Sequence, residues 1–355
     1  MKIKPKKITL KDIAEIAGVS SAAVSGVLNN SPRIKCGKSK RDLILSLAKK
    51  HNYAPNSSAR ALAVGRTGQI GFLVAEMATL GLGNAYFALQ LSGIEKFVTE
   101  RGYLTTVSAC NLNNINKFVF PDKLKRRSVD GLFVSGPVFP EVLDIIKDIG
   151  TPAIICCDPY KVNAVDTMRL SENQFYLSFN NRLHHSQAIS FFYDLGHRKI
   201  FLSSLWYDSP LYCDDAIELI HRPLENSCTF QQGVRLGEEW CREKPEKRFT
   251  AVLGSNQFCL GFIRFLNSVK PGLCPDEVSV LSLDSVPLNE YTFPSLSSCS
   301  RDPYMYGDTG ARILLDCIEK KCSDDELEMQ VRSFYNAKID IIERESTGPG
   351  PTHNK

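Results

Sequence analysis

The sequence predicts a small all-α head with a helix-turn-helix, followed by an α/β body of two lobes, each built on a doubly wound parallel sheet. Residues 9–29 carry apolar side chains at the spacing of two short helices. From residue 69 onward, strand-like runs alternate with helical stretches in two successive series. The net charge changes sign between these regions. A chain of 355 residues is long enough for the two or three domains that these patterns indicate.

The segment 9–29, TLKDIAEIAGVSSAAVSGVLN, is predicted to form two helices joined by a tight turn. Its inward-facing apolar residues are Ile13, Ala17, Val24, Val27 and Leu28. Ala14 and Gly18 are small where the helices cross, and Thr9 and Ser20 can cap the two helices with a side-chain oxygen. Such a unit places its second helix in the major groove of DNA. The alternative is an ordinary pair of amphipathic helices in a core.

Positive charge is concentrated at the start of the chain. Residues 1–66 hold 14 Lys and Arg against 3 Asp and Glu, whereas residues 67–355 hold 29 against 36. A basic head on an acidic body is typical of a nucleic-acid-binding domain attached to a different domain. A solvated basic tail is the alternative.

The composition excludes several other classes of protein. No apolar stretch follows the basic first residues as in a signal peptide, and no run approaches the roughly 18 apolar residues of a membrane span. The 12 cysteines are scattered, without a C-x-x-C pair or zinc-like spacing. We therefore expect a cytoplasmic protein with reduced thiols, no cofactor, no metal and no membrane contact.

An enzyme is not expected either. The sequence has no G-x-G-x-x-G, no G-x-S-x-G and no P-loop. His184, His185 and His197 lie in or beside a predicted helix, where a surface or core role is more common than catalysis.

Two further elements complete the head. Residues 38–51 are predicted to form a third helix, with Leu43, Leu47 and Ala48 facing inward. Residues 56–63, NSSARALA, are predicted to form a capped segment of about two turns, too short to be a stable helix alone. This segment should order only when something holds it.

The body is predicted from two series of elements. The strand-like runs are 70–75, 103–109, 130–135 and 152–158, and then 199–204, 250–255 and 278–284. The helical stretches between them are 85–101 and 141–149, and then 185–195, 231–242 and 258–268. In doubly wound sheets, ligands bind beyond the carboxyl ends of the strands, here between the two lobes.

With these elements in order, the chain resembles transcription regulators of the lactose-repressor (LacI/GalR) family over nearly its whole length. The matching stretches are residues 9–29, HNYAPNSSARALAVGRTGQIGFLV, VDGLFVSGP, DLGHRKIFLSS, PDEVSVLSLDSVPL and IIERES. The resemblance implies a DNA-binding head, a hinge helix, and a body like periplasmic sugar-binding proteins in which the chain crosses between the lobes three times.

The expected boundaries follow from this resemblance. The head covers residues 1–55, and the hinge helix and linker cover residues 56–68. The effector-binding and dimerisation body covers residues 69–346, with lobe 1 at about 69–164 and 299–327 and lobe 2 at about 165–298 and 328–346. Residues 347–355 are expected to form a disordered tail.

The recognition helix implied by the resemblance is residues 21–29, with Ser21, Ala22, Ser25 and Gly26 facing the groove. None of these residues can make the bidentate contacts worth ~1–3 kcal/mol of base discrimination, so we expect weak direct readout and more dependence on DNA shape. The full set of expected DNA-binding residues is Thr9, Ser20, Ser21, Ala22, Ala23, Ser25, Gly26, Asn29, Tyr53, Asn56, Ala59, Arg60 and Leu62.

Leu62 stands where the family places a leucine that enters the minor groove at the operator centre. An apolar wedge unstacks a base step and kinks the duplex, and added contacts offset the cost. Asn56 would cap this hinge helix, and Arg60 would stabilise it or reach the DNA backbone. An ordinary core leucine is the alternative.

The expected ligand-binding residues between the lobes are Asn84, Phe87, Asp158, Asn256 and Asp284. By the resemblance, Phe87 stacks on a ring and the acceptors bind sugar hydroxyls, although turn and cap roles are common for Asn and Asp. The chain departs from the family in three places. The segment LWYDSPLYCDDAIELI lacks the arginine that most relatives supply to the effector, Phe179-Asn180-Asn181 replaces Val-Asp-Asn, and Gln257 follows Asn256.

The sequence therefore predicts a DNA-binding transcription regulator, a repressor whose operator affinity depends on a sugar-like small molecule. Its expected partners are palindromic double-stranded DNA and a second copy of itself, joined through the body in a homodimer. The alternatives are a regulator-like protein that has lost effector sensing and a sugar-binding protein without regulation.

Overall fold

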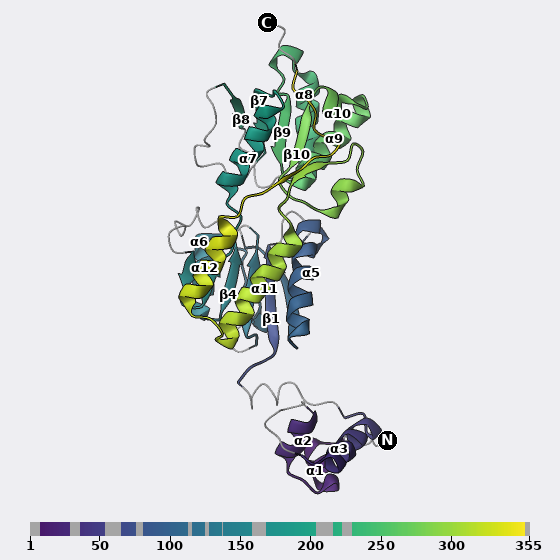
Figure 1. The fold of residues 1–355 in the computed structure, drawn as a ribbon, viewed down its shortest axis with the longest axis vertical. Coiled ribbons are helices and arrows are strands. Elements are labelled where there is room, and N and C mark those ends of the chain that lie inside the picture. Colours follow the sequence, from purple (N-terminus) through teal and green to yellow (C-terminus); the bar gives the residue numbers. More distant parts are fainter. Residues whose placement is uncertain are drawn as a thin grey trace. The chain divides into compact units, whose positions relative to one another are not determined.

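The computed structural model describes residues 8–28, 36–53, 65–75, 81–112, 116–124, 128–136, 138–157, 168–203, 216–221 and 229–351. The chain divides into two compact units, residues 1–67 and residues 68–355 (Figure 1). We call them the head and the body, and each is described by itself.

The described part of the head holds the three predicted helices. They are α1 (Leu10–Ala17), α2 (Ser21–Leu28) and α3 (Lys38–Lys50). Thr9 caps α1 as expected, because its Oγ1 accepts from Asp12 N at 3.2 Å while Asp12 accepts from Thr9 N at 2.8 Å. Gly18 ends α1 at φ +63°, where other residues would be strained. Ser20 caps the start of α2 by accepting from Ala23 N at 3.2 Å.

The core of the head differs at one position from the sequence expectation. Ile13, Val24 and Ile44 are fully buried where the three helices meet. Leu43, expected to face inward, is 38% exposed. Because α3 presents residues at helical spacing, the phase that buries Ile44 with Leu47 turns Leu43 toward solvent.

The first lobe of the body contains a six-stranded sheet in the order β2-β1-β3-β4-β6-β5. Its strands are β1 (Gln69–Ala75), β2 (Leu104–Cys110), β3 (Gly131–Ser135), β4 (Ala153–Cys156), β5 (Arg169–Ser171) and β6 (Gln174–Tyr176). Its main helices are α5 (Ala85–Glu100), α6 (Pro140–Ile149), α11 (Pro303–Glu319) and α12 (Asp324–Tyr335). α5, α11 and α12 bury one core cluster with the sheet, and α6 contributes to a second (Figure 1).

The second lobe repeats this architecture with the order β12-β11-β10-β9-β7-β8. Its strands are β7 (Lys199–Leu202), β8 (Glu218–His221), β9 (Ala251–Gly254), β10 (Ser279–Ser282), β11 (Ser297–Cys299) and β12 (Ile341–Ile342). Its helices are α7 (Asn181–Asp194), α8 (Phe230–Arg242), α9 (Asn256–Val269) and the short α10 (Leu273–Asp276). Both sheets are parallel except for one pairing at an edge, β5 with β6 and β11 with β12.

The boundaries between the lobes fall later in the chain than expected. β5 and β6 extend the first sheet through β4, so lobe 1 continues through residue 176 rather than ending near residue 164. All of α12 also belongs to lobe 1, because Leu327 and Val331 are buried in its core. Arg169 of β5 adds an ion pair to Glu328 of α12. These short elements join lobe 1 because their apolar residues complete its core.

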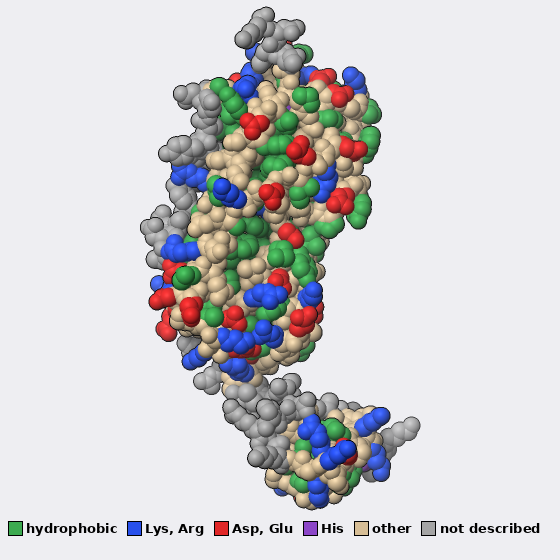
Figure 2. All heavy atoms as spheres, in the orientation of Figure 1, with side chains coloured by type: hydrophobic (Ala, Val, Ile, Leu, Met, Phe, Trp, Pro, Cys, Tyr) green, Lys and Arg blue, Asp and Glu red, His purple; other side chains and the backbone are tan. Residues whose placement is uncertain are grey.

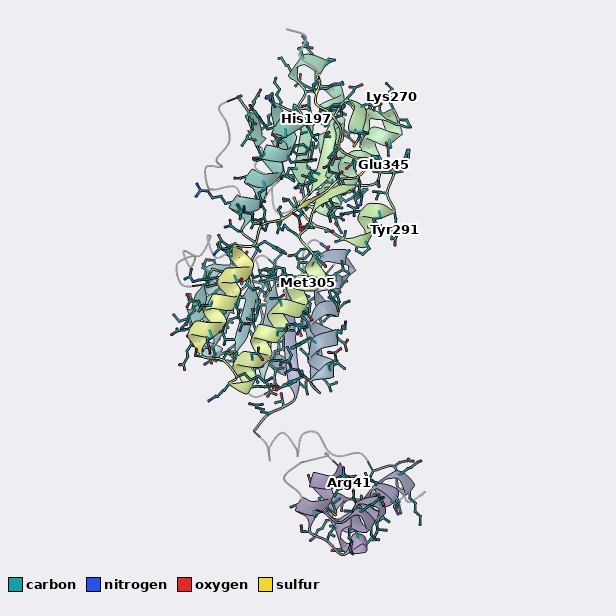
Figure 3. All side chains as sticks on the ribbon, viewed as in Figure 1. Arg41, His197, Lys270, Tyr291, Met305 and Glu345 are labelled. Atoms are coloured by element: carbon teal, nitrogen blue, oxygen red, sulfur yellow. The ribbon has the colours of Figure 1, made fainter. Side chains whose placement is uncertain are left out.

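The end of the chain is packed against lobe 2, which corrects the expectation of a disordered tail from residue 347. Gly348 N donates to Ser279 Oγ at 2.9 Å, and Gly350 N donates to Leu195 O at 2.7 Å. His197, buried in lobe 2 (Figure 3), lies with Nε2 3.1 Å from Gly348 O. Glycine permits this approach, because a Cβ on Gly350 would lie 2.5 Å from the backbone of Gly196. Residues 352–355 lie outside the described part.

Candidate DNA-binding head and interlobe site

The α2 helix presents a short, mostly small-residue surface. Ser21 and Ala22 are exposed, and Ala23 and Ser25 are half-buried. Gly26 is buried with its neighbours, so the expectation that it faces a DNA groove is wrong. Because glycine has no side chain to project outward, surrounding atoms cover its backbone. The exposed part of α2 thus offers methyl groups and a hydroxyl.

The remaining predicted head residues are placed as follows. Thr9 and Ser20 are exposed caps, and Tyr53 is half-buried against the head core. Figure 2 shows Lys and Arg side chains over the described surface of the head, and Figure 3 labels Arg41 among them. The predicted site residues that lie outside the described part of the chain are Asn29, Asn56, Ala59, Arg60, Leu62 and Asp158.

The chain crosses between the lobes three times, as expected. The crossings are residues 177–180 before α7, residues 300–302 before α11 and residues 336–340 before β12. Asp340 N donates to Ser300 Oγ at 2.9 Å, joining the last two crossings. His184 Nε2 lies 2.9 Å from Ala337 O, which joins α7 to the third crossing. The lobes are therefore held at three neighbouring, hydrogen-bonded segments.

Two predicted ligand residues of lobe 1 have structural roles here. Asn84 caps α5, since its side chain accepts from Tyr86 N at 3.0 Å. Phe87 is 3% exposed and belongs to the core of lobe 1. Its ring therefore presents no open face for stacking in this structure, because the helix phase that exposes Tyr86 more turns Phe87 inward.

Asn256 and Asp284 of lobe 2 do come together, at the carboxyl ends of β9 and β10. The Asn256 amide donates to Asn289 Oδ1, and Asn289 Nδ2 donates to Asp284 O at 3.0 Å. Burial raises the pKa of the Asp284 carboxyl, while Arg301 and the backbone N–H of Asn256 act in the opposite direction. The site thus holds a half-buried carboxylate beside two amides.

Sequence reasoning missed Arg301. It lies in the second crossing, is 9% exposed, and places its guanidinium Cζ 4.6 Å from the ring centre of Phe179 in the first crossing. The pKa values of His184 and His185 are lowered to about 4 by burial, with a smaller contribution from Arg301. Both imidazoles are therefore neutral near pH 7. A basic residue two positions after a strand was the available signal, but its burial depends on Phe179.

Comparison with known proteins shows which protein families this architecture resembles. Residues 9–56 match the family described as bacterial regulatory proteins, lacI family, and residues 189–347 match the periplasmic binding protein-like domain. The head is thus a lacI-family domain, and much of the body is a periplasmic binding protein-like domain. Catabolite control protein A of Priestia megaterium is 24% identical, over 90% of this chain and 95% of that protein. The transcriptional repressor PurR of Vibrio vulnificus is 27% identical, over 89% and 93%.

Solved lacI-family structures share the fold. The lac repressor bound to ONPG in the repressed state has a TM-score of 0.70 at 18% identity, covering 96% of this chain and all of that one. The lac repressor dimer bound to operator and the anti-inducer ONPF has a TM-score of 0.66 at 18% identity, covering 97% of this chain and all of that one. The comparison confirms the predicted helical head and two-lobed body.

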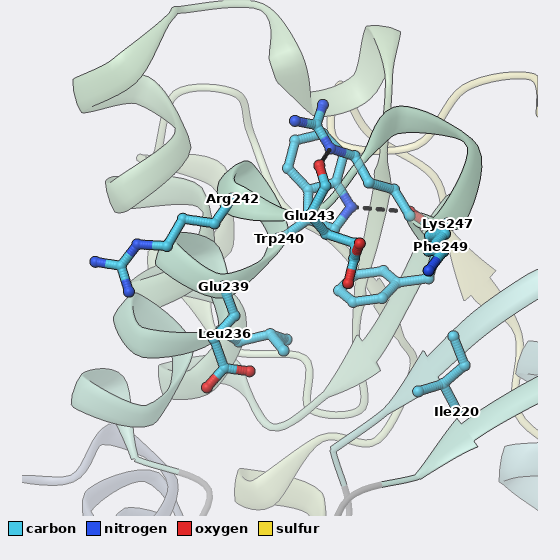
Figure 4. Close-up of a pocket in the computed structure, with 9 residues that line it drawn as sticks. Ile220, Leu236, Glu239, Trp240, Arg242, Glu243, Lys247 and Phe249 are labelled. Atoms are coloured by element: carbon cyan, nitrogen blue, oxygen red, sulfur yellow. Dashed lines mark hydrogen bonds between the residues drawn. The ribbon is translucent and has the colours of Figure 1, made fainter.

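A separate pocket of about 350 Å³ lies on lobe 2 (Figure 4). Trp240, Phe249 and Ile220 supply its apolar walls. Arg248 stacks on Trp240 at 4.4 Å and donates to Glu243 O at 3.0 Å. None of the predicted ligand residues lines it, so we do not assign the effector to this pocket.

Metal binding and membrane crossing can be assessed for the described residues. Among them, no His, Cys, Asp and Glu side chains are grouped so that they could hold a metal ion. In the same part of the chain, none of the helices combines the length and apolar character that crossing a membrane requires.

Proposed function

We propose that this lacI-family chain is a repressor that binds a palindromic operator and responds to a small sugar-like molecule held between the lobes. The observation that carries the proposal is the joining of a capped helix-turn-helix, in a head with net charge +11, to a two-lobed body with a carboxylate at the lobe boundary. One similar structure is a lac repressor dimer bound to operator. Cytoplasmic localisation and the absence of an enzymatic activity belong to the same proposal.

The proposed ligand residues are Asn84, Asp158, Asn256 and Asp284. Support for a sugar comes from two similar structures, a CelR–cellobiose complex with a TM-score of 0.55 and a regulator of Enterococcus faecium with bound ribose, also at 0.55. In this chain, Asp284 and Asn256 provide the acceptors and amides that hydroxyl groups need.

A gel shift with the DNA upstream of the chain's own gene tests this function. The full chain should retard one fragment at nanomolar protein and leave random DNA unbound at the same concentration, because specific binding exceeds non-specific binding by ~10³–10⁷. Addition of an effector sugar should change the retarded fraction. Specific retardation that no small molecule alters would instead favour a regulator that has lost effector sensing.

We expect Leu62→Ala to weaken operator binding by about 1–3 kcal/mol, the scale of one lost base-step contact. The exposed face of α2 offers little base discrimination, so the apolar wedge should carry a large share of it. Fluorescence anisotropy would measure affinity, and circular-permutation gels would measure the bend, which should also decrease.

Random DNA is the control for Leu62→Ala, since the variant keeps every phosphate contact and should bind it as the parent does. If the variant binds and bends the operator like the parent, Leu62 is not a minor-groove wedge in this protein.

We also expect a homodimer formed through the body. In the described part of lobe 2, Tyr291 and Phe293 are 78% and 75% exposed, and Figure 3 labels Tyr291 at the outer surface. Exposed aromatic residues in one short segment are typical of a protein interface. The double change Tyr291→Ser with Phe293→Ser should convert dimer to monomer at micromolar protein in sedimentation velocity.

The control for the dimer is Val119→Ser, which alters an equally exposed apolar residue in lobe 1. This variant should sediment like the parent. A parent that sediments as a monomer would contradict the dimer itself, and a dimeric double variant would place the interface elsewhere.

A further inference from the structure

Arg301 is a buried cation whose charge acts on the Asp284 carboxyl without forming a direct ion pair to it. Its Nε forms no hydrogen bond, and the described residues provide no carboxylate within ion-pair distance of it. The main contact of the group is the face of Phe179, 4.6 Å away. A guanidinium removed from water needs an anion or hydrogen-bond acceptors, and a ring face replaces these only in part.

Arg344 shows how a structural arginine of lobe 2 is satisfied. Its guanidinium donates to Leu296 O at 2.9 Å and Ser298 Oγ at 3.2 Å, and forms an ion pair with Glu290 at 3.3 Å. Arg301 is buried to a similar degree but has none of these bonds. The guanidinium of Arg301 therefore has donors left over to bind another molecule.

Arg301 lies close to Asp284, one of the proposed ligand residues. Its carbonyl oxygen accepts from Ser285 N at 2.9 Å, which fixes the second crossing beside Asp284. The charge of Arg301 also acts on Tyr86, a residue of lobe 1 whose pKa is raised by burial and by Asp284. His185 is buried nearby, and its Nε2 has no hydrogen-bond partner in the described structure. Arg301 thus faces groups from both lobes.

The distribution of basic residues also favours Arg301 as a ligand-binding residue. Residues 204–217, SLWYDSPLYCDDAI, contain no Lys or Arg. The second crossing supplies a cation at the lobe boundary, over Phe179 of the first crossing. A planar guanidinium matches the paired oxygens of a carboxylate or phosphate better than it matches a neutral hydroxyl.

We propose that Arg301 is the charge-recognising residue of the effector site, and that the effector is a hydroxylated small molecule bearing a phosphate or carboxylate. The acid group pairs with the Arg301 guanidinium, while Asp284 and Asn256 bind hydroxyl groups. This inference rests on the proposed function and specifies its ligand as an anion rather than a neutral sugar.

Three matched ligands test the charge requirement on the full chain: ribose, ribose 5-phosphate and ribonate. Inorganic phosphate serves as a minimal probe, and chloride holds the ionic strength constant. By calorimetry, at least one of the two acids should bind at least tenfold more tightly than ribose. Phosphate in the tens of millimolar should raise the melting temperature.

Two variants assign this preference to Arg301. Arg301→Gln should lose at least tenfold in affinity for the acid and change ribose binding less than twofold. Arg301→Lys keeps the charge without the planar fork and should retain part of the preference. Arg312→Gln is the control, because Arg312 also stacks on a ring, that of Phe97 at 4.3 Å, but lies on the exposed side of α11. Its acid affinity should match that of the parent.

The melting temperature measured without ligand distinguishes a binding role of Arg301 from a structural role. Removing an unpaired buried charge should leave the melting temperature of Arg301→Gln unchanged or raised, whereas Arg344→Gln should lower it. The inference is wrong if neither acid exceeds ribose in affinity, or if Arg301→Gln keeps the acid affinity. A parent that binds operator and responds only to neutral sugars overturns this inference alone, whereas acid binding without operator binding overturns the proposed function.

Discussion

A protein lacking residues 1–67 should bind no operator DNA at concentrations that saturate the full chain. The deleted head carries a net charge of +11, and the remaining residues carry a net charge of −7. The body begins at Gly68 as a compact unit of its own, so it should stay folded. Gel shift would measure binding, and circular dichroism would verify that the body remains folded.

Salt dependence provides a second measurement on the full chain. If phosphate contacts supply much of the affinity, the logarithm of the binding constant should fall by ~0.9 per neutralised phosphate for each unit of log salt concentration. A flat salt dependence, or specific binding by residues 68–355 alone, would contradict the role assigned to the head.

The largest expected loss of stability comes from Gly307→Ala. An added Cβ on Gly307 of α11 would lie 2.0 Å from Gln90 O of α5, and backbone oxygen cannot move aside like a flexible side chain. Gly93 makes the reciprocal approach to Tyr304 O, so the two helices are in backbone contact. Alanine normally favours a helix over glycine by about 1 kcal/mol, but overpacking here should reverse the sign.

We expect a net destabilisation of about 3 kcal/mol for Gly307→Ala, measured by urea unfolding of the body. Ser92→Ala on the exposed side of α5 is the control and should change stability by less than about 0.5 kcal/mol. Equal stability of Gly307→Ala and the parent would mean that α5 and α11 can separate freely.

The local patterns of the sequence were enough to predict most helices and strands. Thr9, Gly18 and Ser20 marked the turn of the head, because capping and a positive φ depend on nearest neighbours. The alternation of strands and helices predicted two sheets for the same reason. The phase of α3 was harder, since Leu43 and Ile44 are equally apolar and only packing against α1 and α2 distinguishes them.

The candidate site was predictable in part. Asn256 and Asp284 follow separate strands of one sheet, so strand order alone brings them to the same edge. Phe87 could not be resolved from Tyr86 by sequence, because the rotation of α5 decides which ring enters the core. Gly26 likewise became buried through its surroundings rather than its own chemistry.

The sequence by itself determined the order of the elements, the basic head and the polar residues at strand ends, all of which depend on neighbours along the chain. Only the tertiary structure assigned β5, β6 and α12 to lobe 1 and packed residues 346–350 against His197. It also placed Arg301 over Phe179, 122 positions earlier in the chain. The physical reason is that burial and ion pairing depend on distances between remote segments, which become defined only when the lobes and their crossings pack together.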